Sequence, residues 1–224
     1  MQIFYTVSDS LVNTLSNVNG VVDTNVFGDS FTVALSIISS LCLSTGCGLR
    51  VFTPFFILSL ITYFFPEAIH LSEDVAFMSS LPAVILLGIA ACLEVLAFYI
   101  PWLDNILGAI TVPIAGVSGV ALGAIVLSDL PPAIQWGLAI LGGGGATGLQ
   151  LTIESIRAVS TSVTAGFGNF IVATIENGTA LILSILAIIA PIIALFFLAI
   201  FLLLIFTIGK KFIEKRNKKK QLAS

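Results

Sequence analysis

The chain has 224 residues, of which 58% are hydrophobic and 9% are charged, and its mean hydropathy is +1.13. A soluble domain carries about 25% charged residues, so this chain has too few charges to cover a water-facing surface. The formal net charge is −3, yet most of the basic residues are concentrated in the last 15 positions of the chain. Composition therefore excludes an ordinary soluble domain and predicts an all-α integral membrane protein.

The first 29 residues predict an amphipathic N-terminal segment at the membrane interface. Phe4, Val7, Leu11 and Leu15 recur at helical spacing between polar residues. The segment 1–29 contains no Lys or Arg, so it has no basic region of the kind that begins a secretory signal.

Seven apolar stretches follow, and together they predict a single transmembrane domain over residues 30–208. A helix that spans a bilayer needs about 20 apolar residues, so some stretches are long enough and others are too short. The interpretation is a helical bundle of about 6–8 membrane segments. The stretches cover approximately residues 30–45, 50–65, 81–102, 106–128, 133–148, 149–177 and 180–208.

Two glycine-rich stretches interrupt the apolar sequence. Gly46 and Gly48 precede Arg50 and Pro54 in the first, and residues 142–148 contain five glycines in the second. Irregular backbone is tolerated at membrane depth where protein or a water-filled cavity surrounds it. Each stretch therefore predicts an interrupted or re-entrant helix.

The order of features suggests two weakly similar halves, at about 30–128 and 131–208. In each half a glycine-rich break is followed by an acidic corner and a proline-containing helix; the corners are Asp104 and Glu176. Paired interrupted segments in two halves indicate a transporter binding site. The alternative is that the glycines form two ordinary small-residue helix contacts.

Residues 209–224 form a basic tail that sets the orientation. Seven Lys and Arg residues lie between Lys210 and Lys220, whereas the loop at 66–80 carries acidic residues and no basic ones. Cytoplasmic loops carry an excess of basic residues, so the C-terminus is predicted to be cytoplasmic, with no role in binding nucleic acid. The side of the N-terminus depends on whether the broken segments cross the membrane or turn back.

A few charged residues lie within apolar sequence. A charge at the bilayer centre costs about 2.5–3.5 kcal/mol on insertion scales, so such residues are usually paired or functional. Arg157 lies three residues after Glu154 and can pair with it on one helical face. Arg50 has no acidic neighbour, and the nearest candidates in sequence are Glu94 and Asp104.

Two roles for Arg50 stay open at this point. Beside unpaired backbone N–H groups, its guanidinium could bind a phosphate or carboxylate, with Gln150 in the corresponding place of the second half. Alternatively, Arg50 and Arg157 form internal salt bridges that hold the bundle together. Glu94 is a candidate proton carrier, because burial disfavours a charged carboxyl, or else a structural hydrogen bonder.

The candidate residues thus form two groups, and neither group is catalytic. Three cysteines without a CxxC pattern predict no metal site, and no cofactor is expected. The candidate substrate-binding residues are Arg50, Gly46, Gly48, Gly145, Gly148, Gln150 and Asn169. The candidate proton or charge-pair residues are Glu94, Asp104, Glu154, Arg157 and Glu176.

The chain resembles a family of small bacterial polytopic membrane proteins described as a domain of unknown function. The resemblance covers roughly residues 35–205, but Glu176-Asn177 stands where the family pattern has an acidic pair. It implies a multi-pass protein of the bacterial inner membrane and brings no activity with it. The motifs that carry it are Gly48-Leu49-Arg50-Val51-Phe52-Thr53-Pro54, Leu93-Glu94, Pro101-Trp102-Leu103-Asp104 and the glycine-rich run 142–148.

The leading hypothesis is a small transporter or permeation protein for an anionic small molecule or a lipid phosphate head group. Its site would lie where the two glycine-rich breaks meet in the bilayer. The alternative is a membrane scaffold or partner-binding subunit that transports nothing, whose charges pair with one another. An enzyme is not expected, because the sequence has no HExxH, GxSxG or P-loop pattern.

Overall fold

The computed structural model describes residues 24–66, 69, 71–164 and 167–221, and this part of the chain is helical, without strands. The prediction of an all-α fold is confirmed for these residues. Residues 1–23 of the predicted N-terminal segment, and the side chains of Asp104 and of the basic tail, lie outside the description. The helices are α2 (Thr24–Gly46), α3 (Phe52–Phe64), the 3₁₀ helix η1 (Glu73–Ser79), α4 (Leu81–Ala97), α5 (Pro101–Val126), α6 (Pro132–Thr164), α7 (Phe167–Ile189) and α8 (Pro191–Gln221).

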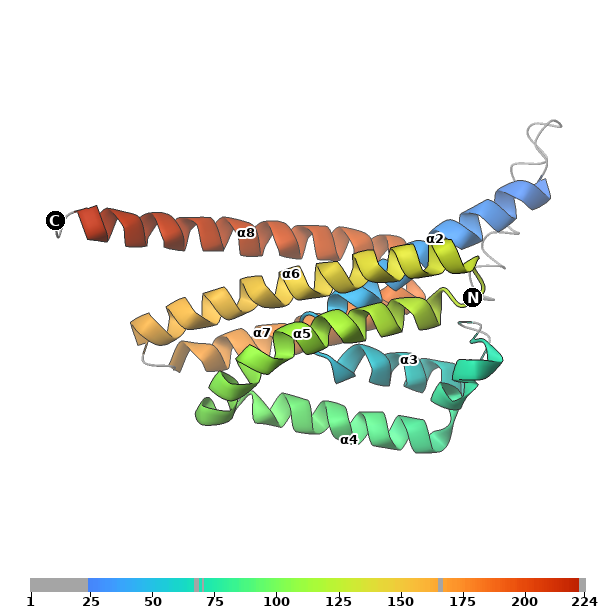
Figure 1. The fold of residues 1–224 in the computed structure, drawn as a ribbon, viewed down its shortest axis with the longest axis horizontal. Helices are drawn as coiled ribbons and strands as arrows, with labels where there is room; N and C mark the ends of the chain where they lie inside the picture. The colour runs from blue at the N-terminus through green and yellow to red at the C-terminus, as the bar shows by residue number, and fades with distance from the viewer. Residues whose placement is uncertain (1–23, 67–68, 70, 165–166, 222–224) are drawn as a thin grey trace.

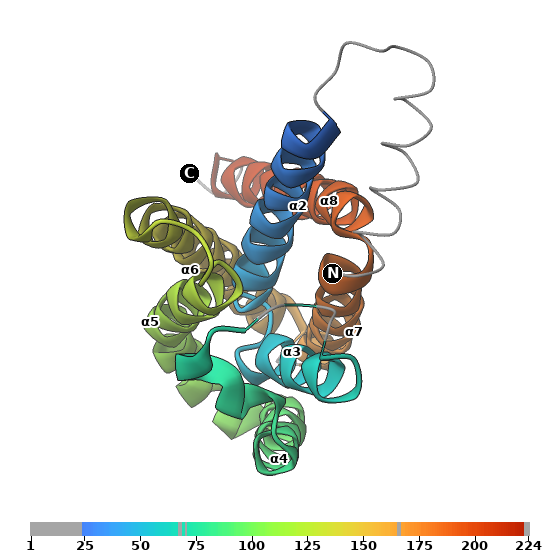
Figure 2. The same ribbon diagram turned by 90° about the vertical axis from the view of Figure 1, so that its right-hand side faces the viewer.

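The helices α4 to α8 run along the long axis of the molecule in alternating directions (Figure 1). Their connections therefore lie at the two ends of the bundle. In contrast, α2 and α3 form a hairpin whose connection lies between the two ends, while η1 lies at the same end as the start of α2. The helix α2 occupies the centre, because it packs against α5, α6, α7 and α8 (Figure 2).

Prolines mark the beginnings of several helices. Pro82, Pro132 and Pro191 each stand in the first turn of a helix, where a missing N–H leaves no hydrogen bond unmade. At α4 the Ser80 side chain also accepts a hydrogen bond from the Ala83 N–H, as serine commonly does before a helix.

The predicted helix break after Gly46 is confirmed. The chain makes a tight turn there, in which the N–H groups of Leu49 and Arg50 both donate to the Gly46 carbonyl. The turn reverses the chain, so that α3 starts at Phe52 and runs back beside α4. This turn places Arg50 inside the molecule.

The predicted second break was wrong. Residues 142–148 lie inside the continuous helix α6, so the two glycine-rich stretches have different conformations and the paired breaks of the repeat hypothesis are absent. The reason is packing: Gly142 and Gly143 stand where a Cβ would collide with α2 and α5. These glycines permit close helix contacts instead of interrupting a helix.

The predicted single segment 180–208 is also wrong, since the chain breaks before Pro191. A proline removes an N–H and clashes with the carbonyl four residues earlier, so α7 ends at Ile189 and α8 begins at Pro191. As a consequence, Glu176 lies in the middle of α7 and not at an acidic corner.

Length and composition identify one described helix, Phe167–Ile189, that is long and apolar enough to cross a membrane alone. A second is obtained if η1 and α4, bent by 66°, count as one span. Four described helical stretches are apolar but shorter: residues 30–46, 52–64, 110–126 and 191–205.

Candidate functional site

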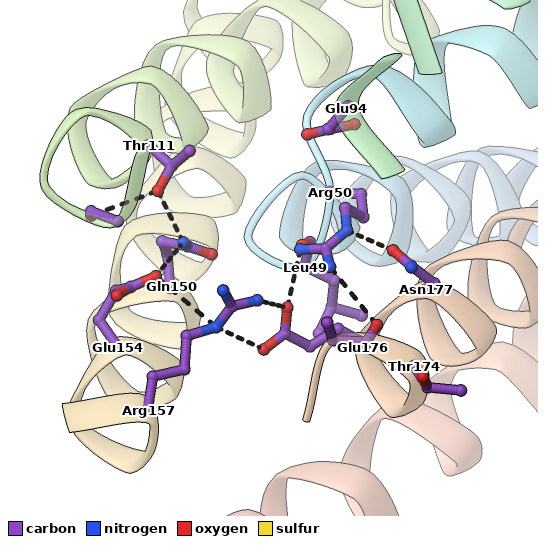
Figure 3. A network of polar contacts seen from close by, with 12 residues as sticks. Leu49, Arg50, Glu94, Thr111, Gln150, Glu154, Arg157, Thr174, Glu176 and Asn177 are labelled. Carbon is purple, nitrogen blue, oxygen red and sulfur yellow. Dashed lines mark hydrogen bonds and ion pairs between the residues drawn. The ribbon is translucent and has the colours of Figure 1, made fainter. Parts of the chain in front are cut away.

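Arg50 is fully paired inside the bundle. It is 1% exposed, and its Nη1 donates to Glu176 Oε2 at 2.7 Å (Figure 3). Its Nε donates to Asn177 Oδ1 at 2.5 Å, and further donors reach the carbonyls of Leu49 and Ala173. Glu94 and Asp104 were the nearest candidate partners in sequence; the side chain of Asp104 lies outside the described residues, and the observed partner is Glu176, 126 residues away in sequence.

Arg157 binds the same carboxylate. Its Nε donates to Glu176 Oε1 at 3.1 Å, and its Nη2 pairs with Glu176 Oε2. The predicted pair with Glu154 also exists, at 3.9 Å between Arg157 Nε and Glu154 Oε1, but it is the longer contact. Two buried guanidinium groups from the α2–α3 connection and from α6 thus converge on one carboxylate of α7.

Phe98 completes the surroundings of the two arginines. The guanidinium carbons of Arg50 and Arg157 lie 4.0 Å and 4.5 Å from its ring centroid, which is cation–π geometry. Phe98 was not predicted as a site residue. The available indication was its spacing, because Phe98 follows Glu94 by four residues and so shares its helical face.

Glu94 binds backbone rather than arginine. Its two carboxylate oxygens accept hydrogen bonds from the N–H groups of Val51 and Phe52, at 2.6 Å and 2.9 Å. The first N–H groups of a helix have no partner within that helix, and the positive end of the helix dipole favours an anion. Glu94, which belongs to the neighbouring helix α4, therefore caps the N-terminus of α3.

A polar branch extends from Arg157 to α5. Gln150 Nε2 donates to Thr111 Oγ1 at 2.9 Å and to Glu154 Oε1 at 3.1 Å. Gly108 of α5 makes room for the Glu154 carboxylate, which a Cβ at that position would hit. Gln150 is thus part of the network, although it reaches Arg50 only through other residues.

A second branch extends from Arg50 to the outside of α7. Asn177 Nδ2 donates to the Tyr99 hydroxyl at 3.3 Å, and that hydroxyl lies 3.1 Å from Thr174 Oγ1. Asn177, Tyr99 and Thr174 were not predicted as site residues. Asn177 could have been found, because it directly follows a charged residue within apolar sequence.

The four candidate glycines differ in position. A Cβ on Gly48 would meet the backbone of Ala146, so this glycine lets the hairpin turn touch α6. Gly145 approaches α2 in a similar way, and Gly46 has ordinary contact distances around it. A Cβ on Gly148 would meet nothing within 4 Å, so this glycine is not required by a close helix contact and its place in the site stays a prediction.

Asn169 lies near the start of α7, two turns before Glu176. Its Nδ2 donates to Thr161 Oγ1 at 3.0 Å, which joins α6 to α7 near their connection. This bond supports the α6–α7 contact and does not involve the α2–α3 turn.

Chemically, the centre of the network is a pair of buried guanidinium groups whose charge the Glu176 carboxylate compensates. Planar guanidinium groups bind carboxylate and phosphate oxygens with short, charge-assisted hydrogen bonds. Removing one partner of a buried pair leaves an uncompensated charge, whereas replacing the whole set by apolar side chains is often neutral. The presence of these buried charges is therefore weak evidence for a net gain in stability.

Comparison with known proteins gives one match. We found no curated protein and no solved structure that matches the chain. The sequence profile of DUF4126, described as a domain of unknown function, matches residues 37–211. That range covers most of the chain and contains every residue of the network, so the chain belongs to the DUF4126 family.

Proposed function

We propose that the chain is an integral membrane protein and that its helices pack as a bundle inside the bilayer. Large apolar side chains on the outer faces of the peripheral helices support this. Leu86, Ile89, Leu93 and Leu96 recur at helical spacing on α4 and are 54–68% exposed. Soluble proteins rarely expose apolar surface so continuously, and here the charged side chains of the network are inside.

The dimensions of α8 fit a bilayer. Residues 191–209 precede the first lysine of the tail, and 19 residues at about 1.5 Å each rise about 28 Å. The hydrocarbon core of a bilayer is about 30 Å thick. Lys210 would then emerge at the interface, on the cytoplasmic side by the positive-inside rule.

In this orientation α2 and α3 form a re-entrant hairpin. The α2–α3 connection lies between the two ends of the bundle, and both helices open toward the end opposite the basic tail (Figure 1). η1, which contains no Lys or Arg, lies at that same opposite end, and this agrees with the positive-inside rule. The topology that we propose has five full spans, α4 to α8, and one hairpin.

Within this bundle we infer a small transporter or permeation protein for an anion. The single observation that carries the proposal is the convergence of Arg50 and Arg157 on the carboxylate of Glu176 at the hairpin turn. A substrate carboxylate or phosphate offers the same oxygens and could replace Glu176 in another state. Buried ionisable residues in membrane helices usually mark such pathways.

One observation favours the alternative, a scaffold that transports nothing. Arg50 is almost fully buried and bonded to a buried carboxylate, as the scaffold hypothesis predicts. The network would then serve to fix the hairpin to α6 and α7. The two functions differ in whether Arg50 ever meets an anion from solution.

Anion flux distinguishes the two functions. The purified protein in liposomes is tested with chloride, phosphate and small carboxylates, and with a labelled anionic lipid for head-group movement. We expect flux above that of empty liposomes, and at least a tenfold loss in Arg50→Gln, because neutral amide cannot replace the guanidinium. Glu73→Gln, an exposed acid of η1, is the matched control.

The scaffold alternative makes a different prediction for the same assay. Wild-type protein would then show no flux with any of these anions or with the lipid, while Arg50→Gln would still lower thermal stability. Loss of stability without any wild-type flux would contradict the transport proposal.

A further inference from the structure

The helix α4 lies at the edge of the bundle. It packs mainly against α3 and η1, and Figure 2 shows it beyond α3, away from α8. Of the residues 81–97, all of which the structure describes, Ala91 alone is buried. At Gly88, a Cβ would lie 3.0 Å from the Phe56 ring of α3, so this glycine lets the two helices pack closely. Partly buried side chains such as Leu87, rather than a set of fully buried ones, therefore hold α4 in place.

Two inward contacts stand out at the end of α4. The Glu94 carboxylate accepts the N–H groups of Val51 and Phe52, and Phe98, which caps the helix, lies against both guanidinium groups. Phe98 is buried, in contrast to most of the helix before it. The end of α4 thus covers both the start of α3 and the arginine pair.

In a bilayer, the forces that hold α4 against α3 differ from those in water. Lipid tails are as apolar as leucine, so no hydrophobic driving force presses one membrane helix against another. Separation of α4 from α3 exposes apolar side chains to lipid at little cost. The polar contacts at Glu94 then become a large part of what holds the helix, because charge-assisted hydrogen bonds are the strong ones.

We propose that α4 is a movable cover and that Glu94 is the latch that holds it closed over Arg50 and Arg157. In the closed arrangement seen here, Glu94 occupies the N–H groups of α3 and Phe98 shields the arginines. Release of Glu94 lets the end of α4 move outward and uncovers the arginine pair. The proposal depends on the membrane placement proposed above, but not on transport.

Cys47 is a natural reporter for this motion. It is 1% exposed and lies in the α2–α3 connection, three residues before Arg50. With Cys42→Ala and Cys92→Ala, its thiol is the one that a charged, water-soluble thiol reagent can modify. Labelling is followed in nanodiscs, where both membrane faces are accessible.

We expect Glu94→Ala to raise the Cys47 labelling rate at least tenfold, with Glu94→Gln in between because the amide still accepts one hydrogen bond. Glu73→Gln, an acid of η1 outside the network, should stay within twofold of the parent. Equal labelling rates in parent and Glu94→Ala protein of intact helicity would overturn the proposal.

A distance measurement separates cover movement from general loosening. Spin labels at Leu93→Cys near the end of α4 and Ile140→Cys on α6, both exposed positions, should move apart in Glu94→Gln in a chain without native cysteines. A second pair, Ile140→Cys and Ile175→Cys on α7, should keep its distance. If the distance distributions of both pairs change alike, or if neither changes, α4 does not move independently of the bundle and the proposal is contradicted. Cys47 labelling and the spin-label distances can both be measured on a protein that shows no anion flux. The cover proposal and the transport proposal can therefore fail separately.

Discussion

Replacing Glu176 by Gln lowers the free energy of unfolding by about 3–5 kcal/mol in our account, because a buried charge loses its compensation. The carboxylate is shared by Arg50 and Arg157, and both guanidinium groups are buried. An amide of the same size keeps the packing but removes the negative charge. The measurement is denaturant unfolding of the purified protein in bicelles.

The second acid of the network provides the matched control. Glu154 lies 3.9 Å from Arg157 and its side chain is 23% exposed, so its contact with the guanidinium is longer and less buried than that of Glu176. We expect Glu154→Gln to cost about 1 kcal/mol. Equal losses in Glu154→Gln and Glu176→Gln would contradict the central position given to Glu176.

We expect the network as a whole to add little stability compared with apolar side chains at the same positions. A triple variant with Arg50→Met, Arg157→Met and Glu176→Leu removes all three charges together, and we expect it to recover most of the loss seen in Glu176→Gln. The triple variant should nevertheless show no anion flux. Stability without flux would mean that the charges are kept for function.

Two adjacent glycines of α6 should respond in opposite ways to the same substitution. A methyl group on Gly143 would meet the Gly116 carbonyl oxygen and the backbone nitrogen of Val120, and backbone cannot move aside. Overpacking of this kind costs about 1–3 kcal/mol or more. A methyl group on Gly144 would meet no atom within 4 Å. Gly144→Ala should therefore stabilise the helix by about 0.5–1 kcal/mol.

This pair tests the close contact of α5 with α6. The two variants have the same composition and lie in the same helical turn, so a difference between their unfolding free energies reports packing alone. Stabilisation in both variants would show that α5 does not approach α6 at Gly143.

The sequence allowed the all-helical fold and the break after Gly46 to be predicted, but the break that it predicted at 142–148 does not exist. Gly46 and Gly48, followed by Pro54, indicated an interruption, and the chain does turn there. The same reasoning failed at 142–148, because a glycine-rich segment can also be a helix against which neighbours pack closely. The positions of α2 and α5 decide between the two, and a single sequence does not contain them.

For the site, the sequence identified the charged residues but not their pairing. Arg50, Arg157 and Glu176 were all singled out, yet Glu176 was placed at the edge of a helix that ran through Pro191. Had Pro191 been taken as the start of a helix, Glu176 would have fallen in the middle of an apolar one. Its pairing with Arg50 still requires the tertiary fold, because the two are 126 residues apart.

The re-entrant hairpin is the central claim, and thiol accessibility in intact cells tests it most directly. In a chain without native cysteines, Ser30→Cys at the start of α2 and Glu73→Cys in η1 lie on either side of the hairpin in sequence. Ser162→Cys lies near the end of α6, at the end of the bundle where the tail emerges. We predict that an impermeant reagent labels the first two from outside and Ser162→Cys only after permeabilisation. Labelling of Ser30→Cys and Glu73→Cys from opposite sides would contradict the hairpin.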